Sequence, residues 1–581
     1  MFLEKNIFRT HPIAIKNIIK FLLMLITFIF LPKFSVGQET KSKWKLVGNI
    51  GLYGDFYSME SDTPGAVAAR RPNSMERLVV NSTITYGKFS MPISMMLSGG
   101  QYSVVLPHLP EGNLIDYIKN PMNRIGIAPK YKWAQLLLGT QVPQYSELSV
   151  GDLPVFGAGI NLTPGKFRFS AFAGTSQLAI DESTTKNIKG VYARNIFSAK
   201  IGYGKEDGTH FYIISSIMKD DTNSLKTKPV NTLPQKGILS SIDYKLKIGE
   251  QYAIKGEIAG SAFTRDIRSK PISFANMPID IPSEIFKIQE SSRFDYATVL
   301  SIVKEGKIFN LKLSGKYIGD GFVPLGFPFM QTDRLEVSID PGFNLLKNKI
   351  QFSGSIGTRY NNLSGARAST TRQTIGFANL NWQFTESFSL ATSFSNFSFR
   401  NSLRNDTFRI DMVTLSWSAS PTYIFTTPNN MHIFTVMYAQ NTFADYNTIS
   451  GALSNNDSRN ASASYLLSKV KNPLSISTIL SYFDNNTSFG LLTTNAANLT
   501  LSYKFLDKKL STSSGITYSD NSVNSLASGS QIVTVLGMKY TLKKKTDFSV
   551  NGSINLYKYG ADRPGISYRE NLLRTSITYK F

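Results

Sequence analysis

The sequence predicts an all-β fold: a transmembrane, up-and-down antiparallel β-barrel of about 26 strands, within a range of about 22 to 28. Three observations carry this prediction. Apolar and polar residues alternate along short segments, tight turns alternate with long connections, and the chain is 12% aromatic but only 18% charged. A barrel needs this mixture because apolar residues face lipid while small polar residues face the lumen.

The final segment, 571–581, shows the alternation clearly. One side carries Leu573, Thr575, Ile577, Tyr579 and Phe581, and the other carries Arg574, Ser576, Thr578 and Lys580. A period of two with one apolar side indicates a half-buried strand. A strand that runs to an aromatic residue resembles the C-terminal assembly signal of bacterial outer-membrane β-barrels. The alternative is a soluble sandwich that ends on its last strand.

The first 37 residues favour the membrane alternative. A basic start (Lys5, Arg9, Lys16 and Lys20) is followed by the apolar run 21–31 and by small residues at 35–37. This pattern predicts a secretory signal peptide, 1–37, and a single barrel domain, 38–581. The apolar run is shorter than the roughly 20 residues of a membrane helix. An exported chain without such a helix can still span lipid as a closed barrel.

Connections between the predicted strands come in two lengths. The short ones include Gly87-Lys88, 163–165, 205–208, 248–250, Glu305-Gly306, Asn348, 427–430 and Asp507-Lys508. The long ones include 58–75, 103–122, 220–233, 266–289 and 445–459. About 13 long and about 12 short connections give about 26 strands, with short turns and both chain ends on the periplasmic side of the outer membrane.

Strand direction gives a second test of this topology. Descending strands should end in an aromatic girdle, and such endings recur at Tyr86–Phe89, Tyr244, Trp382–Phe384, Tyr503–Phe505, Tyr540 and Tyr579–Phe581. Within strands, Phe352, Gly354, Ile356 and Tyr360 alternate with polar residues. Phe388, Leu390 and Phe394 share a face until Asn396, where Phe397 and Phe399 shift phase, and this shift predicts a β-bulge.

The formal net charge is +23, and its placement matters more than its size. Lysines gather beside the short turns, at Lys88, Lys132, Lys205, Lys247, Lys304, Lys307, Lys347, Lys349, Lys469, Lys471, Lys508, Lys509, Lys543, Lys544 and Lys545. A basic periplasmic rim fits contact with anionic lipid headgroups. An anion-selecting lumen and docking of an acidic periplasmic partner are the alternatives. This placement argues against nucleic acid as a partner.

The runs 157–174 and 199–221 resemble large outer-membrane β-barrel proteins of the Bacteroidota. The resemblance implies an outer-membrane location, a barrel fold and insertion by the outer-membrane barrel assembly machinery, and it transfers no site residues. TonB-dependent receptors carry a plug of more than a hundred residues before their first strand. Here the first predicted strand starts near Trp44, directly after the signal peptide, which argues against a receptor of that class.

The sequence predicts no cofactor, no metal site and no enzyme. There is no cysteine, and no histidine cluster offers a transition-metal site. A membrane hydrolase would need a histidine on the outer side with a Ser, Asp or Asn partner. Only His108 lies in a long connection, and no spacing nominates its partner. Asp181, Glu182, Asp220 and Asp221 are interpreted as solvated loop acids.

One long connection, 266–289, is unusually apolar for a loop. Its apolar residues include Phe274, Met277, Ile279, Ile281 and Phe286, which we predict to form a constriction in the lumen. Packing on another loop, or docking of a partner, would explain them equally well. The connection 103–122 is a second candidate for filling the lumen.

The sequence therefore predicts an outer-membrane channel or transporter that its own loops gate or plug. The alternative is a non-conducting structural or interaction component of a surface or secretion assembly. Its partners would be outer-membrane lipids, the assembly machinery and other envelope proteins.

Overall fold

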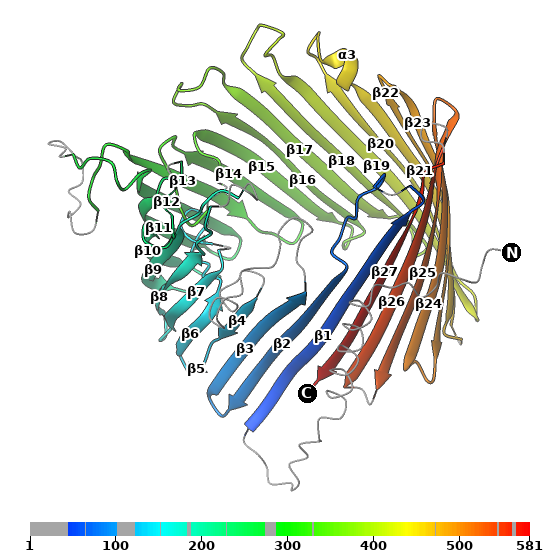
Figure 1. Cartoon of the computed structure of the whole chain (residues 1–581), viewed down its shortest axis with the longest axis horizontal. Coiled ribbons are helices and arrows are strands. Elements are labelled where there is room, and N and C mark those ends of the chain that lie inside the picture. Colours follow the sequence, from blue (N-terminus) through cyan, green and yellow to red (C-terminus); the bar gives the residue numbers. More distant parts are fainter. Residues whose placement is uncertain are drawn as a thin grey trace.

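One antiparallel β-sheet closes on itself to form a barrel, shown as the ring of arrows in Figure 1. The ring closes because β1 pairs with β2 on one side and with β27 on the other. The computed structural model describes residues 44–63, 65–100, 123–151, 153–182, 188–227, 229, 231–272, 286–327, 330–470, 472–542, 545–560 and 565–581. The predicted signal peptide, 1–37, lies outside these residues.

The strands follow one another around the ring in chain order. The first half comprises β1 (Trp44–Ser61), β2 (Ser74–Tyr86), β3 (Phe89–Gly100), β4 (Arg124–Ile127), β5 (Lys130–Tyr131), β6 (Ala134–Gln141), β7 (Val155–Leu162), β8 (Phe167–Gln177), β9 (Ala193–Gly204), β10 (His210–Asp221), β11 (Lys236–Ile248), β12 (Tyr252–Thr264), β13 (Ser292–Lys304) and β14 (Phe309–Ile318). The second half comprises β15 (Arg334–Leu345), β16 (Ile350–Asn361), β17 (Thr371–Gln383), β18 (Phe388–Asn401), β19 (Asp411–Thr426), β20 (Asn430–Asp445), β21 (Asn456–Lys469), β22 (Leu474–Thr487), β23 (Gly490–Phe505), β24 (Leu510–Val523), β25 (Leu526–Leu542), β26 (Thr546–Tyr559) and β27 (Ser567–Lys580).

β4 and β5 share one position in the ring. Both pair with β3 on one side and with β6 on the other, and only Ala128 and Pro129 separate them. Proline lacks the N–H that a ladder needs, which explains the interruption. The 27 strands therefore occupy 26 positions, as the sequence predicts.

The two ends of the barrel differ in how the strands are joined. At one end, which we call the turn end, every connection is short, from Gly87-Lys88 to 543–545. The opposite end, the loop end, carries the long connections. Two loop-end connections, 488–489 and 524–525, have only two residues, so the predicted alternation of lengths fails there. The predicted aromatic endings lie at the turn end, for example Tyr86, Trp382 and Tyr503.

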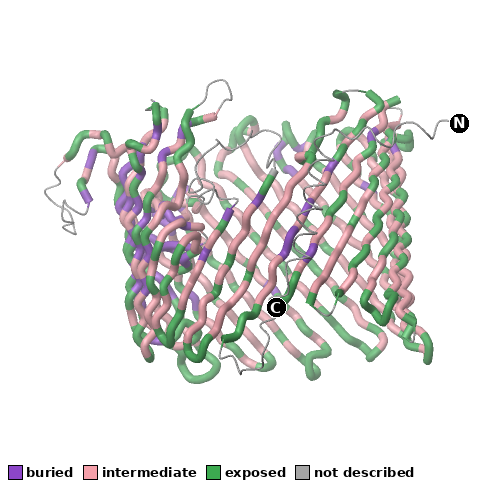
Figure 2. Tube along the Cα trace, turned by 60° about the horizontal axis from the view of Figure 1, so that its bottom comes forward, coloured by how far each residue is buried: buried purple, intermediate pink, exposed green. Residues whose placement is uncertain are grey.

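Alternate residues of each strand point to opposite faces of the wall. On one face, large apolar side chains are exposed, such as Ile242 (41%), Ile258 (55%) and Leu300 (44%). Neighbours on the other face, such as Ser241 and Glu257, are buried against chain inside the ring. Burial is concentrated on one side of the barrel (Figure 2). We call the first face outward and the second inward.

The predicted bulge at Asn396 is wrong. β18 pairs with β17 and β19 in unbroken register through this residue. Phe397 pairs with Ile375 and Phe399 with Gln373, so both rings lie on the inward face. The change of phase in the sequence marks the point along β18 where the large apolar side chains stop occupying outward positions and begin to occupy inward positions.

Within the described residues the one helix is α3 (Gly451–Ser454), between β20 and β21. No described helix is long and apolar enough to cross a membrane.

Candidate functional site in the barrel lumen

Two loop-end connections pack against the inward face of the wall. Their described residues are 142–151 with 153–154, between β6 and β7, and 319–327 with 330–333, between β14 and β15. Leu148, Val150 and Phe322 within them are fully buried. We call these two segments the inner layer.

Two apolar clusters hold the inner layer against β8–β14. The first contains Val150, Val155, Phe172, Ile196, Met218, Phe263 and Leu325. The second contains Leu148, Leu239, Ala259, Ala297, Ile318 and Phe322. Burying apolar side chains of this size is the main favourable term in packing. Part of the inward wall is therefore apolar because a second layer of chain covers it.

The two segments of the inner layer also contact each other. A Cβ added to Gly151 would lie 2.7 Å from the Phe327 ring, and one added to Gly326 would lie 2.8 Å from the Ser149 carbonyl oxygen. Both distances are below a normal carbon contact, and at Gly326 the neighbour is backbone, so this position needs glycine. The two segments therefore form one packed unit.

Glu257 on β12 fixes the first segment. Its carboxylate, almost fully buried, accepts hydrogen bonds from Ser146 Oγ (2.6 Å) and from the Leu148 backbone N–H (3.0 Å). A backbone bond from Tyr145 N–H to the Val150 carbonyl (2.8 Å) closes the turn between them. Burial raises the pKa of the Tyr145 phenol above its ordinary value.

Polar contacts tie both segments to neighbouring strands. Lys316 Nζ on β14 donates to Glu147 Oε1 at 2.7 Å. In the second segment, Gly321 N–H donates to Asp295 (2.8 Å) and Val323 N–H donates to Ser261 Oγ (3.2 Å). Backbone N–H groups in both segments therefore have hydrogen-bond acceptors, as buried polar groups require. The inner layer is therefore anchored as part of the wall.

Beside the inner layer the inward face is charged. A hollow of about 480 Å³ is lined by residues that include Glu147, Lys255, Glu257, Lys312, Lys316, Glu336 and Arg359. Arg359 and Arg334 both pair with Glu336, at 2.7 and 3.1 Å. Among the described residues no group of three or more His, Asp or Glu could hold a metal ion. The arrangement therefore places a charged hollow beside the apolar inner layer.

The predicted constriction is only partly within the described residues. Phe274, Met277, Ile279 and Ile281 lie outside them, as does the second candidate, 103–122. Phe286 is buried, with its ring edge-on to Phe294 (6.1 Å between centroids) and under Lys236 Nζ (4.4 Å). Phe294 lies on the opposite face of β13 from Asp295, which contacts the inner layer.

The described stem of this connection is paired. Pro271 and Gln289 form an antiparallel bridge. The segments that follow β12 and precede β13 project away from the ring in Figure 1. The constriction stays a prediction, and the structure adds a different lumen element, the inner layer, which the sequence analysis did not identify.

The histidines take separate roles. His108 lies outside the described residues. His210 Nε2 lies 3.3 Å from Asp243, and His432 Nδ1 lies 2.8 Å from the Tyr465 hydroxyl, both near the turn end. The described lysines of the predicted rim, such as Lys88, also lie at or beside turn-end connections.

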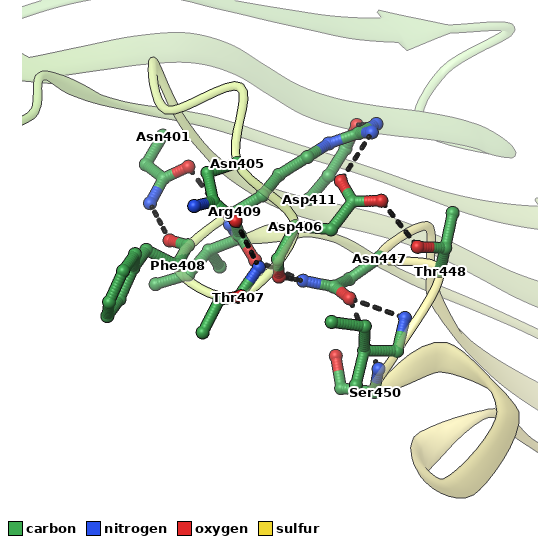
Figure 3. A network of polar contacts seen from close by, with 12 residues as sticks. Asn401, Asn405, Asp406, Thr407, Phe408, Arg409, Asp411, Asn447, Thr448 and Ser450 are labelled. Atoms are coloured by element: carbon green, nitrogen blue, oxygen red, sulfur yellow. Dashed lines mark hydrogen bonds and ion pairs between the residues drawn. The ribbon is translucent and has the colours of Figure 1, made fainter.

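A polar network joins two loop-end connections, 402–410 and 446–455 (Figure 3). Asn447 Nδ2 donates to the carbonyl oxygens of Asp406 and Arg409, both at 2.6 Å, and Thr448 Oγ1 donates to the Asp406 carboxylate. Three apolar side chains of these connections, Phe408, Ile449 and Leu453, are each at least 61% exposed at this rim. Phe489 of the neighbouring connection 488–489 is 79% exposed, and Ser488 Oγ beside it donates to the Leu453 carbonyl oxygen. We call these four apolar side chains the loop-end surface.

Comparison with known proteins gives a likeness of fold. No family model and no curated protein matches the chain. Solved structures similar to it include the P pilus usher PapC translocation pore (TM-score 0.37, 10% identity, 92% of this chain and 99% of that chain). Others are a mutant ferric enterobactin receptor PfeA from Pseudomonas aeruginosa (0.40, 9%, 92% and 80%) and Acinetobacter baumannii OccAB2 (0.29, 12%, 60% and 92%).

Proposed function

We propose that the protein is a channel in the outer membrane and that solutes pass through its lumen, one side of which is covered by the inner layer. The observation that carries the proposal is the contrast between the two faces of a closed wall. Large apolar side chains such as Ile258 and Leu300 are exposed outward, whereas the inward face beyond the inner layer carries mainly polar and charged residues such as Ser393, Lys312 and Glu336. In lipid only closed barrels and helices satisfy their backbone groups, and a 26-strand ring leaves a wide interior.

The inner layer sets the shape of the proposed path. It covers β8–β14 and is anchored by Glu257, Lys316 and two apolar clusters. Solute would pass between this layer and the opposite wall. The layer then acts as a fixed constriction from one side of the lumen, and other loops would gate the remaining opening.

We propose that the turn end faces the periplasm, so that residue Trp44 and the end of β27 lie on that side. The lysines there, such as Lys88, Lys347 and Lys508, suit the anionic headgroups of the inner leaflet. Insertion would require the outer-membrane barrel assembly machinery. The proposal includes no enzymatic reaction, cofactor or nucleic acid.

Single-channel recording in a planar bilayer tests the proposal. The refolded chain should produce discrete conductance steps. Replacing residues 144–151 by an eight-residue Gly-Ser linker should enlarge those steps, because Leu148 and Val150 would no longer hold the layer in the lumen. The matched control replaces residues 402–409 at the loop-end rim and should leave the step size close to that of the unmodified protein.

Silence from a correctly inserted, heat-modifiable barrel would contradict a free channel. It would favour the second candidate, a non-conducting interaction component of a surface assembly. The exposed loop-end surface supports this candidate, because exposed apolar patches mark interaction sites. Stable co-purification with an envelope protein, lost in Phe408→Ser/Phe489→Ser, would be its signature.

A further inference from the structure

The inner layer does not cover the wall formed by β17–β22. Inward side chains there are accessible, with Phe377 and Phe397 each 43% exposed. In the covered wall, Phe172 and Leu239, which pack under the inner layer, are only 1% and 4% exposed. Exposing large apolar rings to an aqueous lumen is unfavourable. Their presence on this wall therefore calls for an explanation.

Two adjacent inward rows of small polar residues run across this wall. Cross-strand pairing places Ser395 beside Ser416, Ser416 beside Asn441 and Asn441 beside Ser458 in one row. The next row joins Asn379, Ser393, Ser418, Ala439 and Asn460. We call the polar members of both rows the serine–asparagine floor, which consists of Asn379, Ser393, Ser395, Ser416, Ser418, Asn441, Ser458 and Asn460. They line a hollow of about 460 Å³.

Phenylalanine rings frame the floor. Phe377 pairs with Ser395 at one edge, and Phe483 pairs with Asn460 at the other. Phe397 and Phe443 lie one inward row closer to the loop end, where both flank Thr414. Five strand spacings separate Phe377 from Phe483, or about 24 Å along the wall. The frame is therefore long enough for an extended ligand.

The floor carries hydrogen-bonding groups without charge. Ser393 Oγ and Ser418 Oγ are 2.7 Å apart, and Ser416 Oγ donates to Asn441 Oδ1 at 2.9 Å. A hydroxyl has one donor and two acceptor sites, so these contacts leave acceptor capacity toward the lumen. The nearby charged residues Arg459 and Asp457 lie at outward positions of β21, opposite the floor.

We propose that this wall binds a neutral oligosaccharide. Sugar rings present hydroxyls at their edges and apolar C–H faces, which match the serine–asparagine floor and the phenylalanine frame respectively. A charged ligand finds no counter-ion on the floor, and a purely apolar ligand would leave its hydroxyls and amides without partners at a cost. The inference deepens the channel function proposed above and rests on it, since it names the class of solute.

Binding to the full chain in detergent tests the inference by isothermal titration calorimetry. The probes are three neutral linear sugars: maltohexaose, cellohexaose and mannohexaose. At least one should bind, and Phe377→Ala and Phe483→Ala should each weaken that binding about five- to tenfold, the effect of losing one aromatic contact. Phe377→Tyr should retain it. Tyr557→Ala, at a lumen-facing ring on β26, is the control and should bind as the unmodified protein does.

Failure of all three sugars to bind a heat-modifiable barrel would overturn the inference. Equal affinity in Phe377→Ala, Phe483→Ala and the control would also overturn it, as would tighter binding of a neutral hexapeptide than of any sugar. Because the measurement needs no conduction, its failure is distinguishable from failure of the channel function: a barrel that conducts but binds no sugar contradicts only the solute class.

Discussion

The covered and uncovered walls of this barrel differ in the residues on their inward faces and in what lies against those faces. The wall of β8–β14 presents apolar residues inward and buries them under the inner layer, whose Leu148 and Phe322 are fully buried. The wall of β17–β22 presents serines and asparagines inward and leaves Phe377 and Phe397 exposed. The difference shows that the composition of the inward face reports what lies against it: a second layer of protein in one case and the lumen in the other.

Truncating one ring of the inner layer and one ring of the uncovered wall should give the largest contrast. Phe322→Ala removes a fully buried side chain and should destabilise the inner layer by about 3–5 kcal/mol. The same change at Phe397, which is 43% exposed, should cost far less because little packing is lost. Hydrogen exchange of the amides of 145–150 measures local stability. Equal protection in both variants would contradict the division into two walls.

A second contrast separates the lumen from the lipid on the uncovered side. Leu536 on β25 is 59% exposed at an outward position, and an arginine there should cost about 2–4 kcal/mol if the residue lies near the middle of the bilayer. Its neighbour Val535 is 42% exposed at an inward position, where an arginine reaches water. Urea unfolding in liposomes should therefore show a large loss for Leu536→Arg and little for Val535→Arg. Similar losses would mean that Val535 does not face an aqueous lumen.

The ring of 26 strand positions could be predicted from sequence because each strand carries its own signal. Alternation, turn residues and girdle aromatics such as Trp382 are local patterns that do not depend on the rest of the fold. Phe397 and Phe399 show the limit of that reasoning. Their change of phase predicts a bulge, whereas the register is continuous and the rings face inward.

The inner layer could not be located in this way because it depends on contacts between distant segments. Residues 142–154 are no more apolar than other connections, whereas the apolar residues of 266–289 predict a lumen constriction in that connection. The strands do carry a signal. In 211–218 on β10, apolar residues stand at both odd and even positions, so apolar side chains occupy both faces of the strand. Tyr212 and Ile214, on the inward face, therefore require another segment to pack on them. The sequence does not show which connection supplies that cover, since loop closure over such distances leaves several candidates.

The smallest effect concerns the polar anchor of the covered wall. Glu257→Ala leaves the buried Leu148 N–H without its acceptor, whereas Ser146 Oγ keeps Ser149 Oγ as a partner, and an unsatisfied buried donor costs about 1–3 kcal/mol. Glu257→Gln keeps one acceptor oxygen and should lose less. We expect faster exchange of the Leu148 amide in Glu257→Ala than in Glu257→Gln, with unchanged exchange across β17–β22. If both variants exchange as the unmodified protein does, apolar packing alone holds the layer, and the two walls differ only in hydrophobic burial.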